Sequence, residues 1–498
     1  MVQRLSSIVF LFAVVSLGCG DGKLAGDASD DTAADDGTDT QADPDAADDP
    51  DSVEEVSDPA ADDTAGDPDA AGDAIDAGDV EEEEETPQTC PSGGWGDILY
   101  QFTADGAIAS TPAVGGEGTV TFGTQNAKLY AVDCHGEQEW DWPYECMDWC
   151  PQAFEGSPAI GEDGTIYIGD DVAVPNYAFA ITPEGDVDWF YETYSVYSQM
   201  DASPVIMNDG TIVFGSHGDS GYVGPIGMII ALDPEGAVLD GFPLNTKAIR
   251  GSPAADGDVL YVGETGRKGG TESINVVFGV MADAETTWRT ELTSIAGFGP
   301  LSLSSLAIDR DGSVVVVENF NAFDEVVDHC TLVLLGSGTG SIDRRIPLST
   351  ESLSVGSPVV GLADFGEDVI VALGNGRLVS ANPFSGGVVI TFDIDLGSSC
   401  AGAPLLADDG NIYAAAGNNV FRISKSGTYS SETDVVEVPG TISTSLAMGP
   451  DGILYMGTTE GKLIALATDA GGLDATAPWP CYRHDGFNTG NQDTVIRD

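Results

Sequence analysis

One short pattern recurs eight times between Gly106 and Ala467, and it constrains the fold more than any other feature of the chain. Its plainest copy lies between Ser157 and Tyr191 and reads SPAIGEDGTIYIG, then YAFAITPEGDVDWFY after a short gap. The spacings between successive copies are 46, 46, 49, 53, 52, 46 and 42 residues, which is the period of β-propeller blades. The first position of the pattern is filled in turn by Thr111, Ser157, Ser203, Ser252, Ser305, Ser357, Ala403 and Ser445.

Each copy predicts four short strands, A to D. An Asp-Gly pair such as Asp163-Gly164 separates the first two apolar runs, and this pair is typical of tight hairpin turns. The next runs, such as TIYIG from Thr165, are rich in β-branched and aromatic residues. The spacing leaves no room for the helices that a parallel sheet needs. We therefore expect an all-β domain over residues 90–498, an eight-bladed β-propeller of four-stranded antiparallel blades.

The two ends of the repeat region predict how the ring closes. After Ala467 the eighth copy continues into GGLDATAPWPCYRHD, which has little strand character. The segment DILYQF, from Asp97 to Phe102, precedes the first copy and has the pattern of a missing outer strand. We expect it to complete the eighth blade, because closure removes exposed sheet edges. The alternative is a ragged eighth blade with this strand docked elsewhere.

The first 18 residues resemble an export signal, with Arg4 followed by an apolar stretch from Ile8 to Leu17. This stretch is too short to span a bilayer as a helix. The ending SLGC resembles a bacterial lipobox, which would make Cys19 the acylated N-terminus, although Ser16 stands where the motif usually has leucine. The alternative is an ordinary secretory signal with an incidental cysteine. Gly20 after the cysteine resembles the sorting signal of outer-membrane lipoproteins.

Residues 19–89 are predicted to form a disordered acidic tether. Residues 20–89 contain 20 Asp, 7 Glu and one Lys, a net charge of 1 − 27 = −26, with few residues that could form a core. Such a segment would hold the propeller away from a membrane. The remaining residues, 90–498, carry 56 acidic and 15 basic side chains, a net charge of −41. We therefore expect no nucleic-acid partner, and membrane contact only through the lipid anchor.

Eight cysteines suit an oxidising compartment, and acylation of Cys19 would leave an odd number for pairing. Cys90 precedes the expected closing strand and Cys481 follows the eighth copy. A Cys90–Cys481 disulfide could therefore hold the seam, where the two ends of the ring meet. Cys134, Cys146 and Cys150 lie close together in sequence and are expected to contain one disulfide. Cys146 and Cys150 could also be read as metal ligands with His135, but we expect no metal site.

Two runs carry a family resemblance: AVDCHGEQEW, from Ala131 to Trp140, and AITPEGDVDW, from Ala180 to Trp189. They are similar to the A-x-D…G…W signature of pyrroloquinoline-quinone-like (quinoprotein-dehydrogenase-like) propeller repeats. The resemblance extends over nearly all of residues 96–492, and the ending WPCYRHDGFNTG, Trp479 to Gly490, looks like the tail of many exported members. That family contains dehydrogenases and also non-enzymatic scaffolds, among them the propeller lipoprotein of the outer-membrane β-barrel assembly machinery.

The resemblance favours the non-enzymatic branch. The dehydrogenases usually carry an adjacent cysteine pair against the quinone and a bound calcium ion, and no two cysteines are adjacent here. The four histidines lie near neither a nucleophile elbow nor a zinc-binding helix motif. We therefore expect no catalytic residues, and neither pyrroloquinoline quinone nor calcium as a cofactor. A dehydrogenase remains the less favoured alternative.

The long departures from the repeat predict where a partner binds. In a blade ordered A to D, the B–C and D–A connections emerge on the same face, and residues 142–154, 170–176, 216–227, 264–275 and 319–330 all fall in such connections. The aromatic side chains in and near these connections either form an exposed docking surface for a protein or a glycan, or fold back as local core. The candidate rim residues are Trp142, Tyr144, Trp149, Tyr197, Tyr222, Phe320 and Phe323.

These observations predict a lipid-anchored recognition scaffold, exported to the bacterial outer membrane or cell surface. A periplasmic or secreted location is the alternative. An outer-membrane barrel-assembly scaffold is the second function considered, but a long acidic tether does not help a protein to grip a partner at the membrane.

Overall fold

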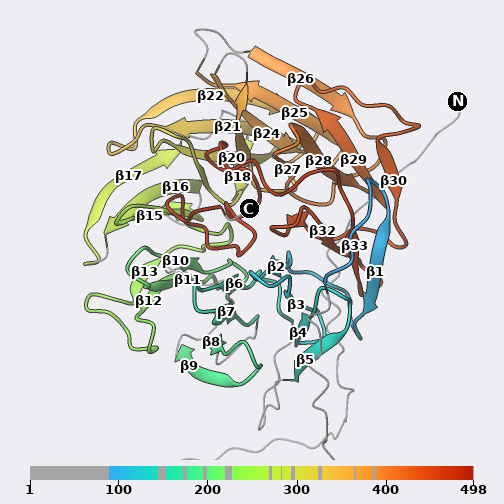
Figure 1. The fold of residues 1–498 in the computed structure, drawn as a ribbon. Helices are drawn as coiled ribbons and strands as arrows, with labels where there is room; N and C mark the ends of the chain where they lie inside the picture. The colour runs from blue at the N-terminus through green and yellow to red at the C-terminus, as the bar shows by residue number, and fades with distance from the viewer. Residues whose placement is uncertain are drawn as a thin grey trace, which may run out of the picture. The chain divides into compact units, whose positions relative to one another are not determined.

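The computed structural model describes residues 89–143, 153–171, 176–193, 199–218, 227–268, 272–281, 283–292, 298–322, 328–363, 366–384 and 389–496. Within them, eight antiparallel sheets are arranged in a ring (Figure 1), which confirms the predicted eight-bladed propeller. No helix in these residues has the length and hydropathy to cross a membrane.

In the first four blades, each sheet is a meander whose strands follow the chain from the axis outwards, as the Asp-Gly turns predict. Blade 1 comprises β2 (Ala113–Val114), β3 (Val120–Gly123), β4 (Lys128–Val132) and β5 (Gln138–Pro143); blade 2, β6 (Ala159–Ile160), β7 (Ile166–Gly169), β8 (Asn176–Ile181) and β9 (Val187–Thr193); blade 3, β10 (Val205–Ile206), β11 (Ile212–Gly215), β12 (Gly227–Leu232) and β13 (Leu244–Thr246); blade 4, β14 (Ala254–Asp256), β15 (Val259–Lys268), β16 (Glu272–Met281) and β17 (Thr286–Leu292).

The last four blades keep this order with two additions, an extra strand in blade 5 and a strand from the N-terminal side in blade 8. Blade 5 comprises β19 (Ala307–Ile308), β20 (Val314–Ala322), β21 (Asp328–Leu335) and β22 (Ile342–Ser349), with β18 (Phe298–Leu303) also paired to β20; blade 6, β23 (Val359–Ala363), β24 (Gly366–Ala372), β25 (Arg377–Asn382) and β26 (Val389–Asp395); blade 7, β27 (Leu405–Leu406), β28 (Asn411–Ala416), β29 (Asn419–Ser424) and β30 (Val435–Glu437); blade 8, β31 (Ala447–Met448), β32 (Leu454–Gly457), β33 (Lys462–Leu466) and β1 (Ile98–Thr103).

The ring closes as predicted, because β1 forms the outer strand of blade 8. It pairs antiparallel with β33, for example Tyr100 with Ala465 and Phe102 with Leu463. The two ends of the repeat region therefore share one sheet, and the alternative of a ragged eighth blade is wrong.

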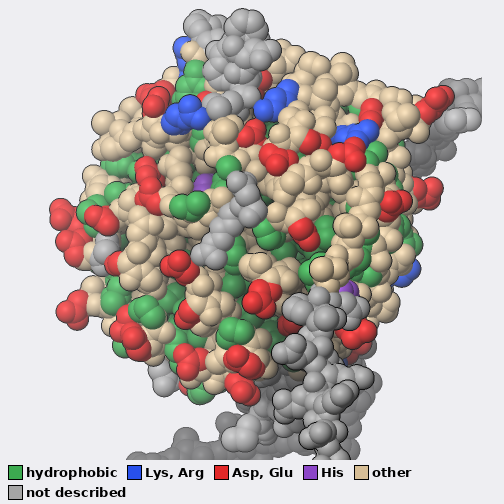
Figure 2. Space-filling view, viewed as in Figure 1, with side chains coloured by type: hydrophobic (Ala, Val, Ile, Leu, Met, Phe, Trp, Pro, Cys, Tyr) green, Lys and Arg blue, Asp and Glu red, His purple; other side chains and the backbone are tan. Residues whose placement is uncertain are grey.

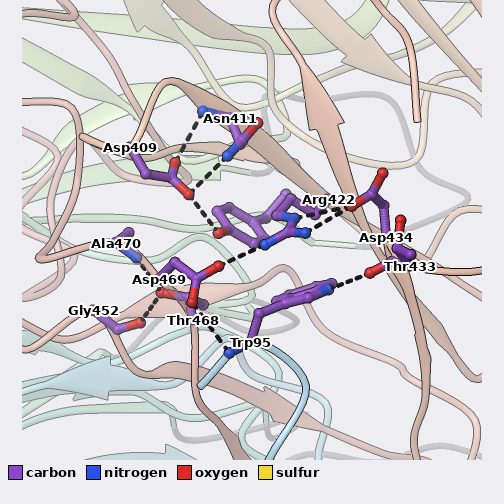
Figure 3. Close-up of polar contacts among 11 residues, drawn as sticks. Trp95, Asp409, Asn411, Arg422, Thr433, Asp434, Gly452, Thr468, Asp469 and Ala470 are labelled. Atoms are coloured by element: carbon purple, nitrogen blue, oxygen red, sulfur yellow. Dashed lines mark hydrogen bonds and ion pairs between the residues drawn. The ribbon is translucent and has the colours of Figure 1, made fainter. Parts of the chain in front are cut away.

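A polar cluster fastens the chain where it enters this seam (Figure 3). The Arg422 guanidinium lies 4.9 Å from the ring centroid of Trp95 and forms 2.7 Å ion pairs with Asp434 and Asp469. The Trp95 indole N–H donates to the Thr433 carbonyl oxygen at 2.9 Å. A cation over an indole face and two carboxylate partners hold the segment before β1 against blades 7 and 8.

The hydrophobic core lies between neighbouring sheets, because each blade buries its faces against the next. Glycines at the end of strand B allow this close approach: a Cβ atom at Gly169 would lie 2.6 Å from the Cβ of Met200 in the next blade. The tryptophans that end the two signature runs, Trp140 and Trp189, also make contacts between blades. Trp140 of blade 1 donates from its indole to the Pro183 carbonyl oxygen of blade 2 at 2.8 Å and covers Gly185.

The D–A and B–C connections share one face of the disc, as predicted. Bridges join residues of the two connections, for example Ile108 with Thr124 and Gln199 with His217. In blades 4 and 5 the long departures from the repeat within the B–C connections form regular strands. There the chain continues in register as the long hairpins β15–β16 and β20–β21, whose backbone pairing runs on beyond the usual blade length.

Candidate functional site

The serines that open six of the eight repeats form much of the wall of the central channel. For five of them, the hydroxyl accepts a hydrogen bond from the backbone N–H at the same position of the preceding blade. For example, the Thr111 N–H donates to Ser157 Oγ at 2.9 Å, and the Ser203 N–H donates to Ser252 Oγ at 3.0 Å. Since a hydroxyl is both acceptor and donor, these serines also supply donor protons along the wall.

The C-terminal tail closes one end of this channel (Figure 1). Its carbonyl groups accept hydrogen bonds from the backbone N–H groups of the innermost strands at 2.7–3.0 Å, around most of the ring. Because these donors lie beside the A–B turns, the tail seals the A–B face. The pairs are Val114 with Gly486, Ile160 with Phe487, Ile206 with Thr489, Ala255 with Gly490, Val360 with Trp479 and Leu406 with Pro480.

Side chains of the tail fill the interior of the channel. Arg483 is 1% exposed and donates to the carbonyl oxygens of Pro204 and Pro253, and burial lowers its pKa to about 10. Asn488 donates to the carbonyl oxygens of Pro112 and Pro158, both at 3.2 Å. The prolines of blades 1 to 4 therefore supply carbonyl acceptors that the side chains of the tail satisfy.

The channel is thus a dead-end pocket of about 320 Å³, open only toward the D–A and B–C face. Tyr482 of the tail lies at its base, where its hydroxyl is 2.8 Å from Ser203 Oγ. The upper lining consists mainly of hydroxyl groups and glycine backbone, with Glu155 and Arg250 as its charged described residues. Such a lining can hydrogen-bond to polar groups of a ligand.

An acidic cluster lies beside the mouth of the channel on blades 2 and 3. His217 Nε2 lies 2.5 Å from Asp201 Oδ2, and His217 is 1% exposed. Burial raises the pKa of Asp170 to about 7; burial and the negative charges of Asp201 and Glu155 raise that of Asp171 to about 6. Within the part of the chain that the structure describes, one buried oxygen on each of these three aspartates, and His217 Nδ1, has no hydrogen-bond partner. Among the described residues, however, no three such groups are arranged to hold a metal ion.

The predicted rim is only partly within the described residues. Trp142 lies in β5, near the end of that strand. Phe320 is fully buried, so its expected exposure is wrong: it lies in the extended β20 between β18 and β21, opposite Pro300 and His329. It follows the alternative interpretation, in which such rings form local core. Tyr144, Tyr197, Tyr222, Phe323 and Trp149 lie outside the described residues.

The predicted Cys90–Cys481 disulfide is wrong. Cys90 is bonded to Cys134, which ties the start of the described chain to blade 1. Cys481 is a free thiol, 2% exposed, because the tail turns into the channel instead of staying at the outer seam. Cys19, Cys146 and Cys150 lie outside the described residues, as do the predicted signal segment and nearly all of the acidic tether.

Comparison with known proteins supports the fold. The sequence matches no protein-family model and no curated protein. Among solved structures, the chain is similar to the crystal structure of BamB from Moraxella catarrhalis, with a TM-score of 0.50 and 14% identity over 74% of this chain and 99% of that one. It is also similar to the Dos1 propeller, with a TM-score of 0.53 and 10% identity over 74% of this chain and 95% of that one. At these identities the likeness establishes a β-propeller fold.

Proposed function

We propose that this chain is an exported, lipid-anchored propeller that binds a protein or glycan ligand at its D–A and B–C face without catalysing a reaction. The observation that carries this proposal is the dead-end channel, which the tail closes at one face and which opens as a hydroxyl-lined pocket at the other. Acylation at Cys19 and the acidic tether would display this face away from the membrane.

The channel lining does not fit the quinone and calcium of the related dehydrogenases. Of the cysteines with free thiols, Cys330, Cys400 and Cys481 are each buried in a different hydrophobic cluster, so they cannot form a pair against a quinone. Glu155 is the single carboxylate among the described lining residues, which is too few for a calcium site built from acidic side chains. The lining therefore favours binding over quinone-dependent oxidation.

A capture experiment tests the proposal. Val355 lines the mouth and is 40% exposed, so Val355→Trp should obstruct the channel while leaving the wall hydrogen bonds intact. We expect the wild-type full chain to retain a ligand from envelope extracts, and Val355→Trp to retain at least about 10-fold less, since a hot-spot contact is worth 2 kcal/mol or more. The control is Ile342→Trp, at a 37% exposed position on outer strand β22, which should bind as the wild type does.

The identity of the captured ligand separates the alternatives. Recovery of barrel-assembly components would favour the assembly scaffold, whereas a soluble or cell-surface ligand favours recognition. Equal capture by wild type and Val355→Trp would contradict binding at the channel mouth. Dye reduction by the full chain after addition of pyrroloquinoline quinone and calcium would contradict the proposal that the chain catalyses no reaction.

A further inference from the structure

The opposite, A–B face carries a groove between blades 1 and 2 that the channel does not use. It has a volume of about 460 Å³ and extends from the tail to the outer strand of blade 1. Half-buried Phe487 lies at its inner end and half-buried Trp140 at its outer end, with Ile160 and Ile166 between them. The Trp140 indole donates to Pro183, the Phe487 carbonyl accepts from Ile160, and both rings pack against one hydrophobic cluster that includes Ile160 and Ile166. The groove is therefore a preformed apolar trough.

The rim of this trough is uniformly acidic. Five exposed carboxylates line it, and no lysine or arginine occurs among its described lining residues. Burial, with smaller effects from the negative charges of Asp133 and Glu117, raises the pKa of Glu139, while a hydrogen bond from Thr119 opposes that rise. In Figure 2, most of the Lys and Arg side chains in view lie over the upper part of the face, whereas carboxylates and hydrophobic groups are interspersed over blades 2 and 3. The five are Glu117, Glu139, Glu162, Asp163 and Glu184.

A second hollow continues the trough toward blade 3. It has a volume of about 280 Å³, shares Phe487, Ile160 and Glu162 with the first, and adds Asp493 and the 77% exposed Val495. The A–B turn of blade 2 forms the ridge between the two. An extended segment could therefore place apolar side chains in both hollows while its cations face the carboxylates.

We propose that this groove binds a segment of a partner protein in which Lys or Arg side chains alternate with apolar ones. Charge complementarity decides the occupant. The acidic tether of this chain, with a net charge of −26, and a second copy of the propeller, with −41, would both be repelled. A basic, amphipathic segment instead satisfies the carboxylates and covers the two aromatic rings. This surface lies on the opposite face from the channel mouth, so the inference goes beyond the proposed ligand site.

Two fluorescent peptides test the inference with the full chain. One alternates Lys with Leu, and the other replaces every Leu with Ser. Fluorescence anisotropy should show binding of the Lys-Leu peptide, weakened by salt, and at least about 10-fold weaker binding of the Lys-Ser peptide, because serine cannot replace the apolar contacts of buried leucine. A photo-cross-linking version of the peptide should label residues 115–121 or 160–166.

Matched charge variants separate this groove from the general acidity of the chain. The triple variant Glu117→Gln/Glu139→Gln/Glu184→Gln should bind the Lys-Leu peptide at least about 10-fold more weakly than the wild type does. Glu235→Gln/Asp240→Asn/Asp258→Asn removes the same charge from exposed positions of blades 3 and 4 and should change binding by less than about 2-fold. Unchanged melting temperatures check folding. Equal effects of the two triple variants, equal binding of both peptides, or no binding would overturn the proposal, and none of these results bears on capture at the channel mouth.

Discussion

The serines at the first position of the repeat show how one residue type can build both the ring and its channel. Ser157, for example, accepts the Thr111 N–H through its side chain and donates its own N–H to Ser203 Oγ. Ala403 has no hydroxyl but still donates its N–H to Ser445 Oγ at 3.0 Å. In five copies, therefore, the serine satisfies a backbone donor of the copy before it, which gives this position of the repeat a structural role.

Asp170 makes a pH-dependent contribution to stability. Its pKa rises from 3.8 to about 7 on folding through burial, so the folded chain binds this proton more tightly than the unfolded chain. This contribution to the free energy of unfolding is greatest below pH 3.8 and is lost as the pH rises to about 7. The loss amounts to at most about 4 kcal/mol. We expect Asp170→Asn to flatten the fall in free energy of unfolding over this range, as measured by denaturant titration.

The matched control for this measurement is Asp258→Asn, at an exposed position of blade 4. It should keep the wild-type pH profile. If Asp170→Asn also keeps that profile, the buried aspartate does not bind its proton in the folded protein.

At the scale of strands, the extended hairpins of blades 4 and 5 are held by buried charge. Glu318 on β20 is fully buried, and its carboxylate forms a 2.8 Å ion pair with Arg345 of β22 and accepts from the Asn275 side chain at 3.3 Å. Burial raises the pKa of Glu318, while the Arg345 charge opposes that rise. The pair therefore depends on both partners being present.

Arg345→Ala should destabilise the protein by about 3–5 kcal/mol, because it leaves the buried Glu318 carboxylate without its partner. Thermal and denaturant unfolding measure this loss. Arg377→Ala, which breaks the half-exposed pair with Asp393, is the control and should cost less than about 1 kcal/mol. Equal losses of unfolding free energy in the two variants would show that burial of Glu318 does not make its ion pair more important for stability than an exposed pair.

Local sequence signals predicted the strands and turns, since Asp-Gly hairpins and β-branched runs act within one blade. They could not predict the partners of segments distant in sequence. Cys481 was placed at the seam from chain order alone, but contacts with strands 100 residues and more away draw the tail into the channel. The buried position of Phe320 depends likewise on β18, which comes from the preceding connection. The small polar residues and glycines of HDGFNTGN were the available signal for a tail that packs against backbone.

At the scale of the whole molecule, three long-range contacts make the ring a single unit. β1 closes blade 8, the Trp95–Arg422 cluster fastens the seam, and the tail bonds to the inner strands of six blades. The tail also makes the two faces different, because it seals one end of the channel. The propeller therefore offers a polar pocket on one face and an acidic, apolar groove on the other.

Hydrogen exchange of the inner-strand amides tests this account most directly. In the full chain, the N–H groups of Val114, Ile160, Ile206 and Ala255 should exchange slowly, because each donates to the tail. A chain that ends at Pro478 should lose this protection at all four positions while the β20–β21 amides stay protected. Rapid exchange at the four amides in the full chain, or protection unchanged by the truncation, would contradict a channel sealed by the tail.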